Sequence, residues 1–313
     1  MKGATLDVKP LAFHPNRIKL GLLAALATVV IWSIYFISLR AGALSPLTAH
    51  ELALFRYTVP GLLLAPIAWK SRHQIMAVPR LYLLGIILGA GLPFFLLSIW
   101  AIKHGNVLQA STLIPGTAPL FVSLLAVILF KQKIGFWRLA GLALISLGIF
   151  TFLAQALLLD TQQLLFAMLA FLLCACLWAI FTLSLRQAQL SPLQAASLIT
   201  VSNGFAILLW VSLTQPEMGA FTMPLGEVLT QVVVQGIIVG VFSSVFYGYA
   251  ILRIGAESTS AVASLTPVTA SVLAWLILGD HLSFIGVIAL TLTTIGVLLA
   301  SGVIHKDQTK GNS

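Results

Sequence analysis

Charge is scarce in this sequence, and its scarcity excludes a soluble fold. Only 8% of the 313 residues are charged, whereas 59% are hydrophobic. A soluble domain needs charged side chains over its surface, but a helix in lipid needs roughly 20 apolar residues to cross about 30 Å of hydrocarbon. The apolar runs here have that length, and short clusters of charge, proline and glycine separate them. The composition therefore predicts an all-α integral membrane protein whose solvent is the lipid bilayer.

Signatures of common catalytic and metal sites are also missing. The sequence contains neither His-Glu-x-x-His nor Gly-x-Ser-x-Gly, and its six histidines fall at the ends of apolar runs or between them. The only cysteines, Cys174 and Cys176, share one apolar run, where a Cys-x-Cys pair on a helix points its thiols to different faces. We interpret both as small apolar residues. We therefore expect no enzyme, no cofactor and no bound metal.

Acidic residues are outnumbered by Lys and Arg, 8 to 17, which gives a net charge of +9. In a soluble protein this balance would suggest nucleic acid. Here the basic residues gather in alternate connections, which is the positive-inside pattern of a multi-pass bacterial inner-membrane protein with both termini cytoplasmic. We therefore exclude nucleic acid as a partner. The cytoplasmic segments hold Lys2, Lys9, Arg17, Lys19, Lys70, Arg72, Arg80, Lys131, Lys133, Arg138, Arg186, Arg253, Lys306 and Lys310, and the outer ones hold Arg40 and Lys103.

The chain divides into ten predicted spans between two cytoplasmic tails, 1–17 and 304–313. The first tail lacks the apolar core of a secretory signal peptide, so we expect the first span to direct insertion. Five spans form a first repeat, 18–157, and five form a second, 158–303. The spans are predicted at 18–39, 47–69, 81–102, 107–130, 136–157, 164–185, 192–214, 228–252, 256–278 and 283–303.

The two halves of the chain repeat each other. The segment from Trp32 to Arg40 returns 146 residues later as Trp178 to Arg186, and later matches are offset by 151 and 148 residues. Because each copy holds an odd number of spans, the second copy must sit upside down relative to the first. The sequence thus predicts two inverted five-helix repeats around a central cavity, the architecture of secondary transporters.

Small and polar residues form a stripe on the fourth predicted span, and the stripe recurs on the ninth. Spacings of three and four residues place these positions on one helix face. Such a face either packs closely against another helix or lines a shared central cavity, which we favour. A proline in each stripe frees a backbone carbonyl, as in the broken helices of transporters. The stripes are Gln109, Thr112, Gly116, Pro119 and Ser123, and, 148 residues later, Glu257, Ser260, Ser264, Pro267 and Ser271.

Aromatic residues within the spans add to the candidate site. Trp32 and Trp178 are repeat partners deep in the first and sixth spans, whereas Trp69 lies near a span end, as an interfacial anchor would. Aromatic walls with a few hydroxyls suit an amphipathic organic solute. The predicted substrate-binding residues are Trp32, Phe95, Ser98, Thr112, Pro115, Gly116, Trp178, Ser244, Tyr247, Ser260, Ser264 and Pro267.

Two charged residues fall within the second span. Glu51 is an acidic side chain within this span, which makes it the candidate for any proton coupling. Arg56 lies five residues further on. Two interpretations of Arg56 are open, a pairing with carbonyls of a neighbouring helix and a contact with a substrate anion.

Several short motifs follow one another in a characteristic order and are duplicated. They are Trp32-Ser33, Phe55-Arg56-Tyr57, Ala101-Ile102-Lys103-His104-Gly105 and Pro119-Leu120-Phe121-Val122 in the first half, and Tyr249-Ala250-Ile251-Leu252-Arg253-Ile254-Gly255, Thr266-Pro267-Val268, Gly279-Asp280 and Gly286 to Gly296 in the second. In this order the chain resembles the drug/metabolite transporter (DMT) superfamily, specifically its ten-span EamA-type exporters, over nearly its whole length.

The resemblance implies a basket of helices that exports amino acids or related small metabolites. Spans one, three, four, six, eight and nine would be the walls, and spans five and ten the outer supports. Two departures from the family pattern matter. The Gly-Glu pair that often follows spans four and nine is replaced by Lys131-Gln132 and Gly279-Asp280, and span one lacks the glutamate by which small multidrug relatives exchange protons for cationic drugs.

We therefore expect a secondary transporter that exports a small amphipathic metabolite by alternating access. Its partners are then a small-molecule substrate and the lipid bilayer, and the sequence carries no signal for an oligomeric state. The alternative is a channel or facilitator for small solutes, which would need a continuous polar pore. An intramembrane enzyme is less favoured, because the chain lacks a nucleophile–base motif.

Overall fold

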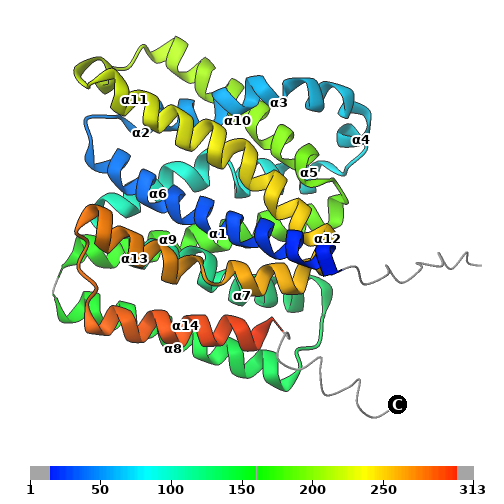
Figure 1. Ribbon diagram of the computed structural model, residues 1–313, viewed down its shortest axis with the longest axis vertical. Coiled ribbons are helices and arrows are strands. Elements are labelled where there is room, and N and C mark those ends of the chain that lie inside the picture. The colour runs from blue at the N-terminus through cyan, green and yellow to red at the C-terminus, as the bar shows by residue number, and fades with distance from the viewer. Residues whose placement is uncertain (1–14, 160, 302–313) are drawn as a thin grey trace, which may run out of the picture.

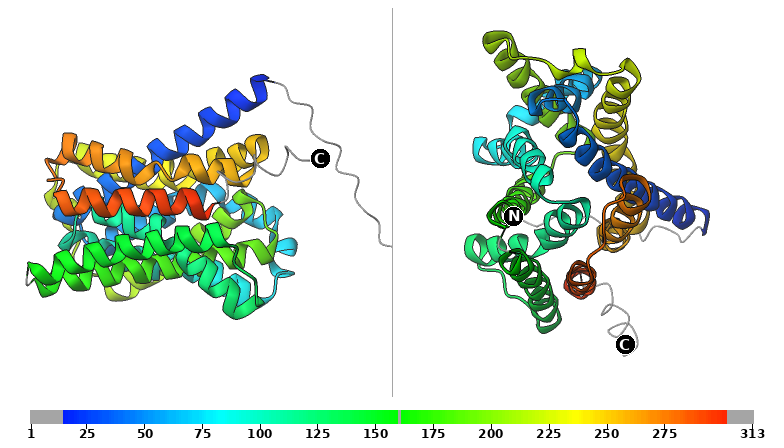
Figure 2. Two further views of the ribbon diagram at one scale, coloured as in Figure 1. Left: turned by 90° about the horizontal axis from the view of Figure 1, so that it is seen from below. Right: turned by 90° about the vertical axis from the view of Figure 1, so that its left-hand side faces the viewer.

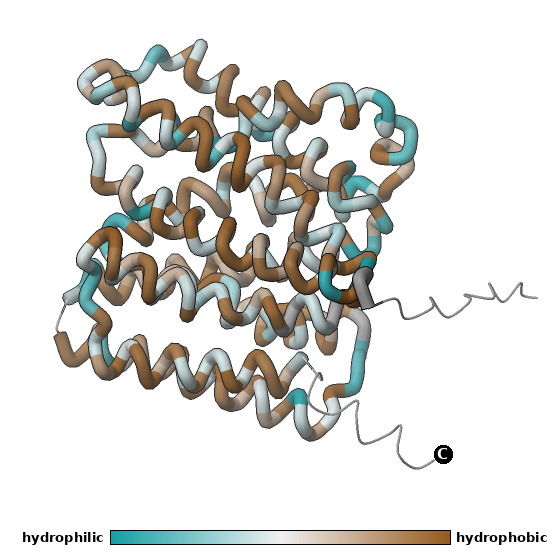
Figure 3. The backbone as a smooth tube through the Cα atoms, in the orientation of Figure 1, coloured by the Kyte–Doolittle hydropathy of each residue, from teal (hydrophilic) through white to brown (hydrophobic). Residues whose placement is uncertain are grey.

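The computed structural model describes residues 15–159 and 161–301, and these residues form helices connected by short loops. The side chains of residues 15–17, 130, 256, 257, 260 and 261 lie outside the description. Most helices run across the view of Figure 1, and the right-hand view of Figure 2 looks along them. Apolar residues cover the helices, while hydrophilic residues concentrate near their ends and in the connections (Figure 3).

The helices follow the predicted spans closely in position. They are α1 (Pro15–Leu44), α2 (Ala49–Ala53), η1 (Leu54–Thr58), α3 (Val59–Lys70), α4 (Arg72–Met76), α5 (Arg80–Gly89), α6 (Leu92–His104), α7 (Val107–Phe130), α8 (Phe136–Leu158), α9 (Gln162–Ala188), α10 (Pro192–Thr214), η2 (Gly219–Thr222), α11 (Leu225–Gln231), η3 (Val232–Phe242), α12 (Ser243–Ala263), α13 (Thr266–Leu278) and α14 (Phe284–Ala300).

Within the described ranges, 8 helical segments are long and apolar enough to cross a membrane. They coincide with the first eight predicted spans, and three of them join consecutive helices: α2 to α3, α5 with α6, and α11 with most of α12. The last two predicted spans correspond to α13 and α14, which are shorter apolar helices. A multi-pass membrane protein is therefore established, whereas the count of ten spans stays a prediction.

The predicted ninth span, 256–278, is not one continuous helix. Gly255 leaves the helical region with φ 82° and ψ 160°, and a turn at Ser264 and Leu265 separates α12 from α13. Pro267 explains the turn, because it has no N–H to donate to the carbonyl of Ala263 and its ring would clash there. The matching Pro119 lies inside α7, which continues through it.

The halves of the chain pack by exchanging partners. Helix α1 lies against α12 and α13 of the second half, while α9, which begins the second half, lies against α5, α6 and α7 of the first. The second helices pair with each other, α3 with α10, and so do the last ones, α8 with α14. This pairing is what a two-fold exchange of the halves would produce, and the inverted relation itself stays a prediction.

The ends of α7 and α13 share one local structure. Lys131 and Gly279, separated by 148 residues, are both left-handed, with φ of 51° and 69°. The next residues, Gln132 and Asp280, each donate a backbone N–H over 3.3 Å, to the carbonyls of Ala126 and Ala274. The repeat read from the sequence thus extends to backbone conformation at these caps.

Buried polar side chains join helices from different parts of the chain. Ser38 of α1 donates its hydroxyl to Gln231 of α11 over 2.8 Å, and Gln235 of η3 donates to the same hydroxyl over 3.1 Å. Asn203 of α10 accepts from the backbone N–H of Leu92, at the start of α6, over 2.8 Å. Each hydrogen bond gives a polar group the partner that the surrounding hydrocarbon could not provide.

The tightest helix pair is α8 with α14, which lie side by side in Figures 1 and 2. A Cβ added to Gly141 would lie 2.5 Å from the carbonyl oxygen of Gly296 and from the backbone nitrogen of Ala300. The close approach therefore requires glycine, because small residues alone let two backbones meet in a membrane.

We predict that Gly141→Leu separates α8 from α14 and destabilises the protein by about 1–3 kcal/mol, the usual cost of overpacking. The measurement is the apparent melting temperature of the purified protein in detergent. Gly226→Leu is the control, because a Cβ there meets nothing within 4 Å. Equal melting temperatures for the two variants would contradict the close contact.

Candidate functional site

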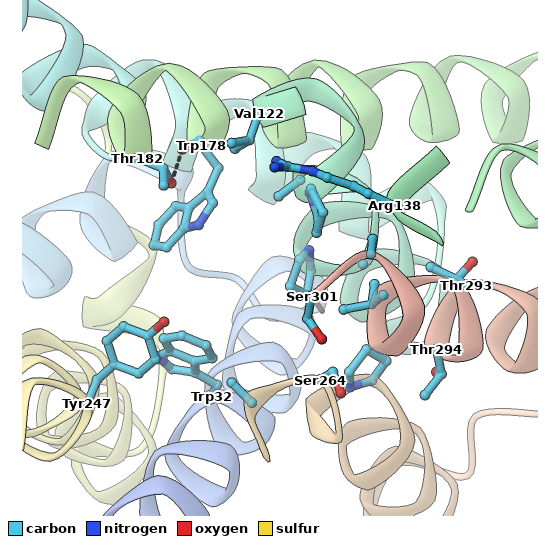
Figure 4. Close-up of a pocket in the computed structure, with 18 of the residues that line it drawn as sticks. Trp32, Val122, Arg138, Trp178, Thr182, Tyr247, Ser264, Thr293, Thr294 and Ser301 are labelled. Atoms are coloured by element: carbon cyan, nitrogen blue, oxygen red, sulfur yellow. Dashed lines mark hydrogen bonds between the residues drawn. The ribbon is translucent and has the colours of Figure 1, made fainter. Parts of the chain in front are cut away.

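A cavity of about 510 Å³ lies between the two halves of the bundle. Its walls come from α1, α7, α8, α9, α12, α13 and α14. Figure 4 shows most of its side chains. The lining residues are Trp32, Pro115, Gly116, Ala118, Pro119, Val122, Arg138, Trp178, Thr182, Arg186, Tyr247, Ala263, Ser264, Pro267, Thr293, Thr294, Val297, Ala300 and Ser301.

The cavity extends to one end of the bundle. Arg138 lies in the first turn of α8, Arg186 in the last turn of α9, and Ser301 directly after α14. These helix termini lie at the end that also holds the connections with Lys70, Arg72, Arg80, Lys131 and Lys133, which we call the basic end. The volume is in the range of small-molecule sites.

The structure brings seven of the twelve predicted site residues together. Trp32, Pro115, Gly116, Trp178, Tyr247, Ser264 and Pro267 all line the cavity. Ser244 is half-buried and outside the lining, and the side chain of Ser260 lies outside the described residues. Which residues contact a substrate stays a prediction.

Three other predicted residues are fully buried away from the cavity. Phe95 packs edge-on against Tyr57, with ring centroids 5.6 Å apart, and Ser98 donates its hydroxyl to the Phe95 carbonyl over 2.8 Å. The hydroxyl of Thr112 is also buried and has no hydrogen-bond partner among the described residues. The face of α6 that carries Phe95 and Ser98 is therefore part of the core.

The expected division into walls and outer supports is wrong at three spans. The third, α5 with α6, contributes no lining residue, while the fifth and tenth, α8 and α14, contribute several. The reason is packing. A Cβ added to Gly116 of α7 would lie 2.7 Å from a methyl carbon of Thr293, so α14 presses directly against the helix that carries the small-residue stripe. Both interpretations of Gly116 thus hold, since it faces the cavity and admits a neighbouring helix.

Aromatic rings occupy the deep part of the cavity. Trp32 lies against Tyr247, with ring centroids 5.2 Å apart, so α1 and α12 contribute one pair. Trp178 of α9 contacts Phe94 and Phe181, at 5.5 and 4.9 Å. Figure 4 shows the indole of Trp178 across the cavity from the Trp32–Tyr247 pair. Both indoles are only partly buried, so each offers a ring surface to the cavity.

Sequence reasoning missed two cationic side chains in this cavity. The positive-inside pattern assigns Arg138 and Arg186 only a role in topology, yet both line the cavity. Arg138 donates from Nε to the hydroxyl of Ser123 on α7 over 3.1 Å. The sequence did point to Ser123, which belongs to the small-residue stripe. No sequence pattern predicts that α8 packs against this part of α7, where Arg138 can reach Ser123. Arg186 is the repeat partner of Arg40.

At the opposite end of the bundle, contacts between distant segments join the helices. Arg40, near the end of α1, donates from one terminal nitrogen to the carbonyls of Ile102 and Lys103, at 3.1 Å for Lys103. The carboxylate of Asp280, between α13 and α14, accepts from the backbone N–H of Val107 over 3.3 Å. A second cavity of about 330 Å³ lies there, and it shares no lining residue with the first.

The candidate for proton coupling, Glu51, serves a structural role. Its carboxylate accepts the N–H and hydroxyl of Thr48, at 2.7 and 2.6 Å, and the N–H groups of Gly219 and Ala220, at 3.0 and 2.8 Å. The side chain is fully buried. It therefore ties the start of α2 to the connection between α10 and α11, at a distance from the first cavity.

The contacts of Arg56 also favour a structural role over a contact with a substrate anion. It donates to the carbonyl of Gln235 on η3 over 3.3 Å and lies 5.5 Å from the ring centre of Tyr35. These are the neighbouring-helix contacts of the first interpretation. Among the described residues, no group of three or more His, Cys, Asp or Glu side chains could hold a metal ion.

Comparisons with known proteins place the chain in a family. The sequence profile of the EamA-like transporter family matches residues 19–154 and, separately, 165–302. No curated protein matches the chain. A solved structure described only as "Crystal structure of protein" superposes with a TM-score of 0.61 and 17% sequence identity, over 94% of this chain and 99% of the other.

At that identity the likeness establishes the fold alone, whereas the two profile matches together cover most of the sequence, one in each half. Their boundaries agree with the internal repeat and with the helices that surround the cavity. The chain therefore belongs to the EamA-like transporter family.

Proposed function

We propose that this protein is a secondary transporter that carries a small amphipathic metabolite across the inner membrane by alternating access. The observation that carries the proposal is the first cavity, which lies between the two halves, extends to the basic end and is separated from the second cavity at the other end. A carrier in one of its two access states has this form. The family assignment supports the same conclusion.

The positive-inside rule supports a cytoplasmic position for the basic end. In that orientation the cavity faces the cytoplasm, and Arg40 and Asp280 close the outer side. Export is the direction that the resemblance to EamA-type exporters implies. Amino acids are the candidate substrates by the same resemblance, and the aromatic rings and hydroxyls of the cavity suit a solute of that size.

The repeat supports a specific closing contact for the second access state. Arg40 holds the outer side by reaching the carbonyls of Ile102 and Lys103, just before Gly105 ends α6. Its partner Arg186 borders the open cavity. When the basic end closes, we expect Arg186 to reach the carbonyls just before Gly255, where α12 bends. The two arginines would then exchange roles between the two states.

We predict that Trp32→Ala and Trp178→Ala each weaken substrate binding a few-fold to about tenfold, because an aromatic contact is worth about 0.5–1.5 kcal/mol beyond its buried area. The measurement is counterflow in proteoliposomes preloaded with unlabelled phenylalanine, leucine or 3-phenylpropionate and tested with the labelled compound. Trp69→Ala is the control, since Trp69 is 69% exposed and lies outside the cavity.

Transient accumulation of label above equilibrium identifies a carrier, because only an exchanging site couples the two fluxes. Uptake that does not saturate and shows no counterflow would instead establish the channel alternative. Unchanged counterflow in both cavity variants would remove the two tryptophans from the proposed site.

We predict that Arg40→Gln opens the outer side, because it removes the contacts with the carbonyls of Ile102 and Lys103. The reporter is a cysteine at Gln109, which lines the outer cavity and is 5% exposed, in a chain whose own cysteines are replaced by serine. Labelling by a membrane-impermeant maleimide should increase several-fold. Lys103→Gln is the charge-matched control, and equal labelling of the two variants would contradict the closing role of Arg40.

A further inference from the structure

The first cavity carries charge of one sign. Among its lining residues with described side chains, Arg138 and Arg186 are cationic and none is acidic. The remaining lining groups are apolar, aromatic or hydroxyl-bearing. A cleft lined by one sign of charge within low-dielectric walls attracts solutes of the opposite sign. The electrostatics of the cavity thus favour an anion.

Neither arginine is neutralised by any other residue that the structure describes. No ion pair joins any of the residues that the structure describes, and the guanidinium of Arg186 makes no hydrogen bond within that part of the chain. Arg138 donates only from Nε, to Ser123, which is 1% exposed and fixes the side chain against α7. Figure 4 shows its guanidinium extended toward Val122 and Trp178. The terminal nitrogens of Arg138 are therefore held at the cavity with no partner among the described residues.

The positive-inside rule alone does not explain this placement. Other arginines of the basic end lie against rings outside the cavity: Arg72 lies 4.6 Å from the ring centre of Trp69, and Arg253 lies 4.7 Å from that of Tyr249. Those side chains cover apolar surface, as interfacial arginines do. Arg138 is instead fixed by a buried hydroxyl on a cavity-lining helix.

A guanidinium presents a planar fork of donors that matches a carboxylate. Across the cavity from Arg138 lie the rings of Trp32 and Tyr247, which suit an apolar or aromatic body (Figure 4). A substrate with a carboxylate at one end and an apolar body at the other would satisfy both ends. A substrate ammonium group, by contrast, would find hydroxyls but no described carboxylate.

We propose that the substrate is an organic anion, a carboxylate with an aromatic or apolar body, and that Arg138 binds its carboxylate while Arg186 attracts it at the mouth of the cavity. This inference rests on the proposed transport function and specifies its substrate class. It places an amino acid second to the matching acid that lacks the amino group, because the described side chains of the cavity offer that group no charged partner.

The test uses three probes that share a ring and differ in charge: 3-phenylpropionate, phenylalanine and phenethylamine. Binding to the full-length protein in detergent is measured by isothermal titration, and each probe is repeated as its indole and isobutyl analogue to cover other bodies. We expect the acid to bind most tightly, the amino acid more weakly and the amine not at all. Arg138→Gln should weaken binding of the acid by on the order of 10- to 100-fold, the size of a lost charge-assisted contact.

Two variants act as controls for this effect. Arg253→Gln removes the same charge from a cavity-lining helix without touching the cavity, so binding of the acid should be unchanged. Ser123→Ala releases Nε of Arg138 and should weaken binding less than Arg138→Gln. Equal loss in the Arg138 and Arg253 variants would mean that general charge, and not this site, binds the anion, and would overturn the proposal.

Failure of this inference can be told apart from failure of the proposed function. If amines or amino acids show counterflow in proteoliposomes and Arg138→Gln leaves it intact, the protein is a transporter but the anion assignment is wrong. If no acid of the three bodies binds, the assignment is likewise wrong. If the acids bind through Arg138 without any counterflow, the site stands and alternating access fails.

Discussion

Hydrocarbon offers a polar group no hydrogen-bond partner, so a buried polar side chain is costly unless it finds one within the bundle. The structure is organised around this constraint. Glu51 meets four donors at the start of α2, Ser38 meets two glutamines of the second half, and Asn203 binds the start of α6. Apart from the two donors of Thr48, these contacts join segments more than 100 residues apart in the chain, so they fix how the two halves meet.

The same constraint makes unpaired groups informative. Thr293 and Thr294 of α14 border the cavity with buried hydroxyls that have no partner among the described residues. The guanidinium groups of Arg138 and Arg186 lie at the same cavity, and no described carboxylate lines it. At this cavity, water or a solute could satisfy them, as expected of a transport site, whereas other unsatisfied groups, such as the hydroxyl of Thr112, are buried away from it.

The two halves are similar in sequence but differ in local structure. As a result, the two ends of the molecule are not equivalent. Pro119 lies within a continuous α7, whereas Pro267 follows a break between α12 and α13. Arg40 is engaged with carbonyls, whereas its repeat partner Arg186 borders open space. One sequence pattern thus supports two conformations of a half, and a carrier that alternates between access states needs both.

Composition determined the membrane class and the positions of the helices, because apolar length and periodicity are local properties that lipid enforces. The internal repeat identified Trp32 and Trp178 as equivalent positions in the two halves. Periodicity also explains why Gly116, Ser264 and Pro267 meet at one cavity, since a stripe of residues on a helix stays on one face. Only the tertiary structure decided which faces meet. In the tertiary structure Phe95 and Ser98 are buried in the core, and α8 and α14 line the cavity. Arg138 of α8 also donates a hydrogen bond to Ser123 of α7. Those outcomes depend on helix-to-helix contacts between distant segments, for which spacing along one helix carries no information.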